Sequence, residues 1–299
     1  MSAGARIALV GYGEVGQILA ADLNARGIDD ITAWDCLFPS LSSAPSCAAK
    51  ASGHVRMARS MPEALRDRSV IISAVTAANC VPAAREAAAA IRPEALYFDL
   101  NSVAPHTKHA AAAEIEATGG RYIEAAVMSP IAPKRIASPI LIGGAHAAAF
   151  EPLARELGFT GVQVFDATLG RASAAKMCRS VMIKGLEALF AEALLAARRH
   201  GVEQTVLESL RDLFPKEDWR RIAAYMISRS LQHGRRRAEE MREAAQAVAE
   251  AGLEPVMSLA CATRQDWAAA HRPARESATL EALLDAILDS IADAARESA

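Results

Sequence analysis

The sequence carries little net charge, and this excludes some classes of partner. Its 299 residues include 33 lysines and arginines against 35 aspartates and glutamates, for a formal net charge of −2. Such a balance gives no overall field that would attract nucleic acid or an anionic membrane. Hydrophobic residues make up 52% of the chain, and its length allows two domains that each bury a core. We therefore expect a globular protein whose partner is a small molecule.

Paired cysteines, metal-ligand spacings and long apolar runs are also missing. The five cysteines are odd in number, widely spaced and without a Cys-x-x-Cys pair, so neither a disulfide framework nor a zinc site is indicated. The N-terminus lacks the apolar run of a signal peptide, and charges such as Lys184, Glu187 and Glu192 interrupt the longest apolar stretches. We expect a reduced, cytoplasmic protein with no membrane segment and no metal.

A glycine motif near the N-terminus is the first sign of function. Four apolar strand-forming residues, Ile7–Val10, run into Gly11-x-Gly13-x-x-Gly16, and the helical run 17–26 follows. In a phosphate-binding turn of this form, the first glycine permits the tight turn. The second lets the backbone approach a pyrophosphate, and the third lets helix and strand pack closely. Taken alone, the motif is equally compatible with a glycine turn that binds no ligand.

The context of the motif favours dinucleotide binding. A second strand-like run, 30–34, ends in Asp35, about 20 residues beyond the last glycine, where a carboxylate accepts the adenosine ribose 2′-hydroxyl. No arginine immediately follows Asp35, so NAD is predicted and NADP is less favoured. The predicted cofactor-binding residues are Gly11, Tyr12, Gly13, Glu14, Val15, Gly16, Asp35, Ala74 and Val75.

The first half of the chain alternates strand-like and helix-like runs, which is typical of a parallel sheet with crossover helices. Further strands are predicted at 55–58, 69–75, 95–100, 122–127, 140–142 and 162–165, and helices at 61–65, 104–118 and 147–157, with an alanine-rich helix ending at 91. The segment 39–52, rich in serine, proline and small residues, is predicted to be a surface loop. The fold class is α/β, with an N-terminal Rossmann domain built on a doubly wound sheet.

After Gly170 no strand is predicted, so we place an all-helical domain at 170–299 behind a dinucleotide-binding domain at 1–169. The run Ala172–His200 has no proline and is predicted to be one helix of about 29 residues. It is apolar on several faces, so it should be buried, with both domains or a second subunit around it. We therefore expect a homodimer joined through residues after Gly170.

Lys176 is one of few polar groups on this helix, and Ser180 and Lys184 follow it at helical spacing on one face. Two interpretations remain open from spacing alone. Its stem could lie on apolar surface with the ammonium group in water, or the ammonium group could carry chemistry.

Several motifs, in order, resemble the β-hydroxyacid dehydrogenase family, in its branch of 6-phosphogluconate dehydrogenase-like NAD-binding proteins. They are the glycine motif, Asp99-Leu100-Asn101-Ser102, Glu124-Ala125-Ala126-Val127, Gly143-Gly144 and the helix start Lys176-Met177-Cys178-Arg179-Ser180. The resemblance implies a Rossmann domain, an all-helical second domain, nicotinamide-dependent oxidation of a hydroxy acid and a lysine that assists proton transfer. By this match Lys176 is the catalytic residue, and Ser102 contacts substrate or nicotinamide.

The chain departs from the family pattern around the substrate. Met128-Ser129-Pro130 replaces a Ser-Gly-Gly sequence, Ser180 stands where the family has Asn, and Glu239-Glu240 falls at a Lys-Asp pair. The resemblance therefore implies Ser102, Met128, Ser129 and Ser180 as substrate-binding residues. The residues around the substrate then differ from those usual in the family. The run Arg235-Arg236-Arg237 is expected to form a solvated face rather than a phosphate clamp, because neighbouring glutamates can pair with it.

We predict an oxidoreductase that transfers a hydride between a nicotinamide cofactor and a small hydroxy acid. Lys176 accepts the substrate hydroxyl proton in oxidation and returns it in reduction. A free lysine pKa of about 10.4 is too high for a base, and burial with cationic Arg179 or Lys184 nearby would lower it. The alternatives are an NAD(P)H-dependent reductase of ketones, imines or semialdehydes that uses the same lysine, and a non-catalytic NAD-binding sensor.

Overall fold

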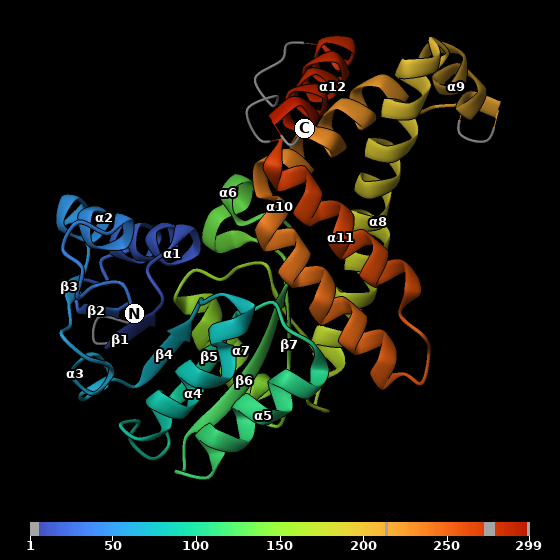
Figure 1. Cartoon of the computed structure of the whole chain (residues 1–299). Helices are drawn as coiled ribbons and strands as arrows, with labels where there is room; N and C mark the ends of the chain where they lie inside the picture. The colour runs from blue at the N-terminus through green and yellow to red at the C-terminus, as the bar shows by residue number, and fades with distance from the viewer. Residues whose placement is uncertain (1–5, 213–214, 272–278, 298–299) are drawn as a thin grey trace. The chain divides into compact units, whose positions relative to one another are not determined.

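A computed structural model of the chain describes residues 6–212, 215–271 and 279–297. The chain divides into two compact units, Met1–Met177 and Cys178–Ala299, which are coloured in chain order in Figure 1. The division falls within helix α8 (Arg171–His200), the long helix whose start marks the predicted second domain.

The N-terminal unit is built on a sheet of eight strands in the order β3-β2-β1-β4-β5-β6-β7-β8 (Figure 1). Every neighbouring pair is parallel except β6 and β7, which are antiparallel. The first six strands have the order of a doubly wound dinucleotide-binding sheet, so the predicted Rossmann fold is confirmed. The strands are β1 Ile7–Val10, β2 Ile31–Trp34, β3 Arg56–Met57, β4 Val70–Ser73, β5 Leu96–Asp99, β6 Arg121–Val127, β7 Ile140–Gly143 and β8 Val162–Asp166.

Helices cover both faces of this sheet, which is why its central strands read as continuous apolar runs. One core cluster joins the sheet to α1, α2 and α7, and a second joins it to α3, α4 and α5. Helices α4 and α5 lie side by side in Figure 1. The helices are α1 Glu14–Asn24, α2 Ala44–Ser52, α3 Met61–Leu65, α4 Cys80–Ala88, α5 Pro105–Glu116, α6 Ile131–Lys134 and α7 Ala147–Glu156, with 3₁₀ turns η1 Ala77–Asn79 and η2 Arg135–Ala137.

The prediction of a surface loop at 39–52 is wrong for its second part, where helix α2 forms. The Ser43 side chain accepts a hydrogen bond from the Ser46 backbone N–H, and Pro45 lies in the first turn. A serine N-cap followed by proline is a strong helix start. The helix ends at Gly53, whose φ of +64° is the left-handed conformation of a helix C-terminus. Local end signals therefore outweighed a composition typical of loops.

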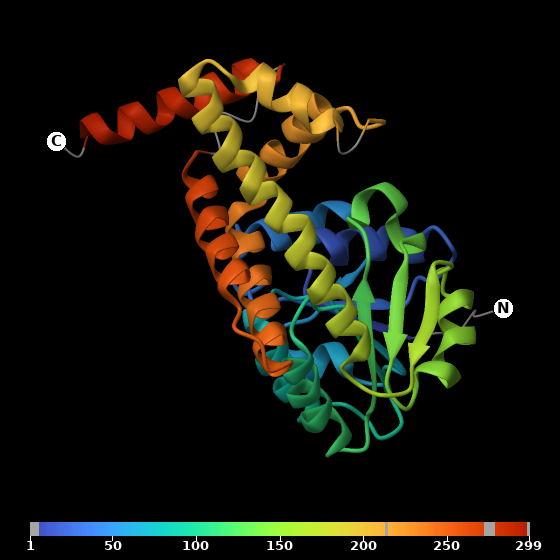
Figure 2. The same cartoon turned by 90° about the vertical axis from the view of Figure 1, so that its right-hand side faces the viewer.

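The C-terminal unit is helical, as predicted: the described residues after Gly170 form helices and turns, with no strand. The helices α10 and α11 run side by side (Figure 2). They approach closely at Gly234, where a Cβ would lie 2.4 Å from the Gln265 carbonyl oxygen. The elements that follow α8 are α9 Glu203–Ser209, η3 Leu210–Asp212, α10 Trp219–Glu250, α11 Val256–Ala270 and α12 Leu280–Glu297. In the described part of the chain, no helix has the length and apolar character to cross a membrane.

Candidate active site

The three glycines of the motif have distinct surroundings after β1. Gly11 has φ +93°, and a Cβ there would lie 2.4 Å from the Ala74 carbonyl oxygen. At Gly16 a Cβ would lie 2.2 Å from the Gly11 carbonyl oxygen, so the first and third glycines are required by packing. A Cβ at Gly13 would meet no atom within 4 Å. Gly13 therefore faces open space that a side chain would fill, and this is the cradle a pyrophosphate needs.

The start of α1 supplies hydrogen-bond donors to this cradle. Gly13 is the N-cap and has no side chain that could cap the helix. The first intrahelical bond beyond it runs from the Gln17 N–H to the Gly13 carbonyl, so the N–H groups of Val15 and Gly16 precede the helical hydrogen-bond pattern. Such N–H groups, together with the helix dipole, favour an anion. The residues of the turn therefore fit a dinucleotide.

Asp35 lies at the end of β2 and ties that strand to the glycine turn. Its Oδ2 accepts the Tyr12 backbone N–H at 2.8 Å, and its Oδ1 accepts the Leu37 N–H at 2.9 Å. Each carboxylate oxygen can accept a second hydrogen bond, so the side chain fits a ribose hydroxyl as well. Tyr12 itself is fully buried, with its ring against Phe38 and its hydroxyl 3.1 Å from Ser52 Oγ. Its backbone N–H and its ring are thus both engaged within the protein.

Asn101 joins the ends of β4 and β5, a role that the sequence analysis missed. Its Oδ1 accepts the Val75 backbone N–H at 2.7 Å, and its Nδ2 donates to Ser73 Oγ at 3.0 Å. The Asn101 N–H donates in turn to Asp99 Oδ1 at 2.8 Å. The Val75 backbone is therefore held by a residue that follows the neighbouring strand, and the Ala74 backbone and the Val75 side chain pack against Gly11.

A fully buried ion pair lies beneath this loop. Lys108 Nζ is 3.1 Å from Asp99 Oδ1 and donates to the Asp99 and Ala125 carbonyl oxygens at 2.9 and 3.4 Å. The Tyr122 hydroxyl donates to Asp99 Oδ2 at 2.5 Å, and burial beside that carboxylate raises the pKa of Tyr122. A sequence signal existed, because Lys108 stands in helical register with the buried apolar Ala111, Ala112 and Ile115 of α5.

Glu124 of β6 holds the start of α8. Its carboxylate is fully buried and accepts two backbone N–H groups, from Gly170 at 2.7 Å and from Ser173 at 2.6 Å. These are donors of the first helical turn, which have no acceptor within the helix, and a negative charge there also complements the helix dipole. The sequence resemblance included Glu124 without assigning it this role.

Lys176 follows one turn later, and the structure brings it together with Ser102. The half-buried Lys176 ammonium group donates a hydrogen bond to Ser102 Oγ, in the loop after β5. The ammonium group is therefore directed at a polar partner inside the N-terminal unit, which disfavours the interpretation of a lysine head in open water. Two predicted catalytic and substrate-binding residues from distant segments thus meet.

The remaining predicted substrate residues make hydrogen bonds to other partners. Met128 and Ser129 follow β6, half-buried, where the Met128 N–H donates to the Pro139 carbonyl at 2.9 Å and Ser129 Oγ donates to the Pro130 carbonyl at 3.1 Å. Ser180 belongs to the helical unit, where its Oγ accepts a hydrogen bond from Lys184 Nζ at 3.1 Å.

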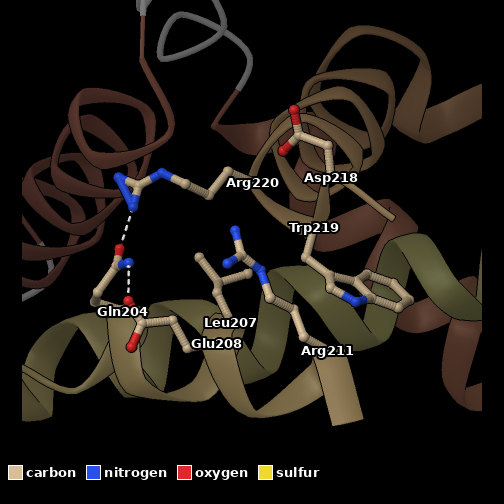
Figure 3. Close-up of a pocket in the computed structure, with 7 residues that line it drawn as sticks. All are labelled: Gln204, Leu207, Glu208, Arg211, Asp218, Trp219 and Arg220. Carbon is tan, nitrogen blue, oxygen red and sulfur yellow. Dashed lines mark hydrogen bonds between the residues drawn. The ribbon is translucent and has the colours of Figure 1, made fainter. Parts of the chain in front are cut away.

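A pocket of the helical unit lies between α9 and the start of α10 (Figure 3). It is lined by Gln204, Leu207, Glu208, Arg211, Asp218, Trp219 and Arg220, and none of the residues predicted from sequence is among them. Arg220 donates to the Gln204 side-chain oxygen, and Gln204 Nε2 donates to Glu208 Oε1 at 2.6 Å. Three of its polar side chains are thus linked to one another. Within the described ranges, no three His, Cys, Asp or Glu side chains are grouped to hold a metal ion.

The fold and the glycine turn define a class: an α/β dinucleotide-binding protein with a helical second unit. A family model, the NAD binding domain of 6-phosphogluconate dehydrogenase, matches residues 6–170, and the chain belongs to this family. Residues 197–268 match a second model, a domain of unknown function called DUF1932. The family expected from the sequence motifs is confirmed.

Solved structures agree with this assignment. A conserved hypothetical protein from Sinorhizobium meliloti 1021 is 34% identical, with 97% of each chain covered and a TM-score of 0.73. The conserved protein MTH1747, described as structurally similar to 3-hydroxyacid dehydrogenases, is 32% identical over 95% of this chain and 99% of its own, with a TM-score of 0.67. The 3-hydroxyisobutyrate dehydrogenase of Mycobacterium tuberculosis, solved with L-serine, shares the fold at 20% identity over 93% and 97% of the chains, with a TM-score of 0.69.

Proposed function

We propose that this protein is an NAD-dependent oxidoreductase that transfers a hydride between nicotinamide and a small hydroxy acid, with Lys176 as proton donor and acceptor. The observation that carries the proposal is the hydrogen bond from Lys176 to Ser102, in the same unit as the glycine turn. The dehydrogenase of M. tuberculosis with the same fold supports the reaction class. When bound, the nicotinamide supplies or accepts the hydride.

The side chains near Lys176 suit a proton-transfer role. Ser102 Oγ accepts the lysine hydrogen bond, so its own O–H is left to donate to a substrate oxygen. Lys176 Nζ donates its proton to the substrate oxygen during reduction and takes the hydroxyl proton during oxidation. Asn101 and Asp99 fix the loop that carries Ser102, and Glu124 fixes the helix start that carries Lys176.

Lys176→Ala separates catalysis from cofactor binding. The substitution removes the proton donor, so kcat should fall by about 10²–10⁴-fold, the usual range for a general acid or base. Lys176→Arg should restore little, because guanidinium stays protonated. NADH affinity, measured by fluorescence titration, should be unchanged, and Lys134→Ala, which removes an exposed lysine of α6, serves as the matched control.

Turnover is measured as NADH formation or consumption with a panel of hydroxy acids, keto acids, ketones, imines and semialdehydes. Oxidation of hydroxy acids supports the proposal, whereas reduction of ketones, imines or semialdehydes alone would assign a reductase that uses the same lysine. NADH binding without any turnover would assign a non-catalytic sensor. An alanine variant that turns over at the wild-type rate would remove Lys176 from the mechanism.

The proposal includes NAD as the cofactor. The Asp35 carboxylate bonds a ribose 2′-hydroxyl and repels a 2′-phosphate. We expect kcat/KM to be higher with NAD than with NADP. Asp35→Asn removes the charge that repels the 2′-phosphate, so the ratio of the two kcat/KM values should move closer to one. A wild-type preference for NADP would contradict this assignment.

A further inference from the structure

Three helices of the C-terminal unit, α8, α10 and α11, meet in a buried group of polar side chains. We call this group the polar seam; it comprises Lys184, Glu187, Ser230, His233, Arg237 and Gln265. Arg237 Nη1 lies 2.6 Å from Glu187 Oε2, and Gln265 Nε2 donates to the same oxygen at 3.2 Å. The expectation that Arg235-Arg236-Arg237 forms a solvated face is therefore wrong for Arg237, which is 8% exposed because it turns inward to a carboxylate on α8.

The seam leaves polar atoms unsatisfied. Arg237 Nε, Ser230 Oγ, His233 Nε2 and Gln265 Oε1 are buried and have no hydrogen-bond partner among the described residues. Ser230, Arg237 and Gln265 are more than nine-tenths buried. Folded proteins pair the great majority of buried polar atoms, and four unpaired atoms in one cluster indicate a bound partner that completes them.

The placement of these atoms indicates that they act together. Ser230, His233 and Arg237 are three and four residues apart on α10, so they share one face of the helix. Gln265 stands opposite, where Gly234 lets α10 and α11 approach closely. The seam thus offers an arginine N–H, a serine hydroxyl and an imidazole nitrogen from one helix and an amide oxygen from another.

The charges of the side chains in and around the seam indicate which kind of ligand it would bind. Lys184 and Arg237 are joined by Arg229 and Arg236 of α10, while the carboxylates are Glu187 and Glu240, the latter 2.7 Å from Lys184 Nζ. Burial and the surrounding arginines lower the pKa of His233 to about 4, so the imidazole is neutral at pH 7. Cations therefore outnumber carboxylates, and a neutral histidine, a serine and an arginine fork together suit an oxyanion.

We propose that the polar seam binds the oxyanion of a small organic acid, a carboxylate or a phosphonate. This oxyanion site rests on the helical unit alone and is independent of the proposed oxidoreductase function. Arg237 Nε–H, Ser230 Oγ–H and the His233 imidazole contact the oxyanion, and Gln265 Oε1 accepts a hydrogen bond from a neighbouring hydroxyl.

The test is calorimetric titration of the full chain, without cofactor, with glycolate, hydroxymethylphosphonate and inorganic phosphate. Arg237→Lys retains a cation for Glu187 but removes Nε–H. The double variant Ser230→Ala/His233→Ala removes two contacts and leaves both ion pairs of the seam intact, so it should fold. Arg235→Gln is the matched control, because it removes an exposed charge from the same turn of α10.

We expect saturable binding of glycolate or hydroxymethylphosphonate that weakens about tenfold or more in both seam variants, as charge-assisted hydrogen bonds are lost. Binding to Arg235→Gln should stay within about twofold of the wild type. Equal affinity in all variants, or no saturable binding of any probe, overturns the site. Binding of inorganic phosphate alone overturns the assignment to an organic acid.

Circular dichroism checks that each variant is folded. NADH titration of the wild type, with no anion present, tests the proposed function by itself. An anion site without NADH binding would thus remove the oxidoreductase proposal while the oxyanion site remained.

Discussion

At the scale of single residues, Lys108 shows how a charge outside the predicted site supports it. The residue is 0% exposed and pairs with Asp99, whose carboxylate also accepts hydrogen bonds from the Tyr122 hydroxyl, the Asn101 N–H and the Cys80 thiol. Asn101 in turn holds Val75. One buried ion pair thus supports the loop that carries Ser102 and the turn beside Gly11.

Lys108→Met should destabilise the N-terminal unit by about 3–5 kcal/mol, because it leaves the buried Asp99 carboxylate without its cation. The double variant Asp99→Asn/Lys108→Met should recover a large part of this loss, since no buried charge remains. Urea unfolding monitored by Trp34 fluorescence, in a Trp219→Phe/Trp267→Phe background that leaves Trp34 as the sole tryptophan, measures both.

Lys50→Met on the exposed face of α2 is the control, with an expected change within about 0.5 kcal/mol. A cost below about 1 kcal/mol for Lys108→Met would show that Tyr122 and the backbone N–H suffice to hold the Asp99 carboxylate.

At the scale of elements, α8 depends on a side chain from another strand for its start. Glu124 of β6 accepts the Gly170 and Ser173 N–H groups, and Lys176 lies within the following turn. The position of Lys176 is therefore set by the sheet as well as by the helix that carries it.

Glu124→Gln should loosen the first turn of α8. A glutamine has one acceptor oxygen in place of two, so one N–H loses its partner at a cost of about 1–3 kcal/mol. We expect faster hydrogen exchange at residues 170–176, a lower kcat on the substrate that the panel identifies, and unchanged NADH affinity. Glu116→Gln at the exposed end of α5 is the control, and equal exchange in both variants would contradict the capping role.

At the scale of the whole molecule, α8 leaves an apolar stripe exposed on the single chain. Met182, Leu186 and Leu189 are 66%, 39% and 55% exposed, and their helical spacing places them in one stripe. Exposed apolar stripes of this kind mark association surfaces, and the stripe supports the proposal of a homodimer.

Light scattering at micromolar concentration should therefore give twice the mass of one chain, because a symmetric interface pairs the same stripe in each copy. Met182→Glu/Leu189→Glu should give monomers, since it buries charge in that interface. Leu253→Glu, at an equally exposed leucine after α10, should leave the mass unchanged. A wild-type monomer would show that the stripe has no second copy as its partner.

The sequence alone was sufficient for the sheet, the glycine turn and the long helix. Apolar strand runs, Gly11, Gly13 and Gly16 followed by Asp35, and the proline-free run that became α8 are local patterns, and their physical causes lie within a few residues. The start of helix α2 is also encoded locally, by the Ser43 cap, although the composition of residues 39–52 is typical of a loop.

Only the tertiary structure determined which polar groups form hydrogen bonds and ion pairs with one another. Val75 and Asn101 are 26 residues apart, Glu124 and Gly170 are 46 apart, and Glu187 and Arg237 are 50 apart. Periodicity tells which face of an element is buried, but the partner across that face is chosen by how separate elements pack. A buried charge is stable only where packing supplies its counterion, and for this reason the counterions of Lys108 and Arg237 could not be identified from their sequence neighbours.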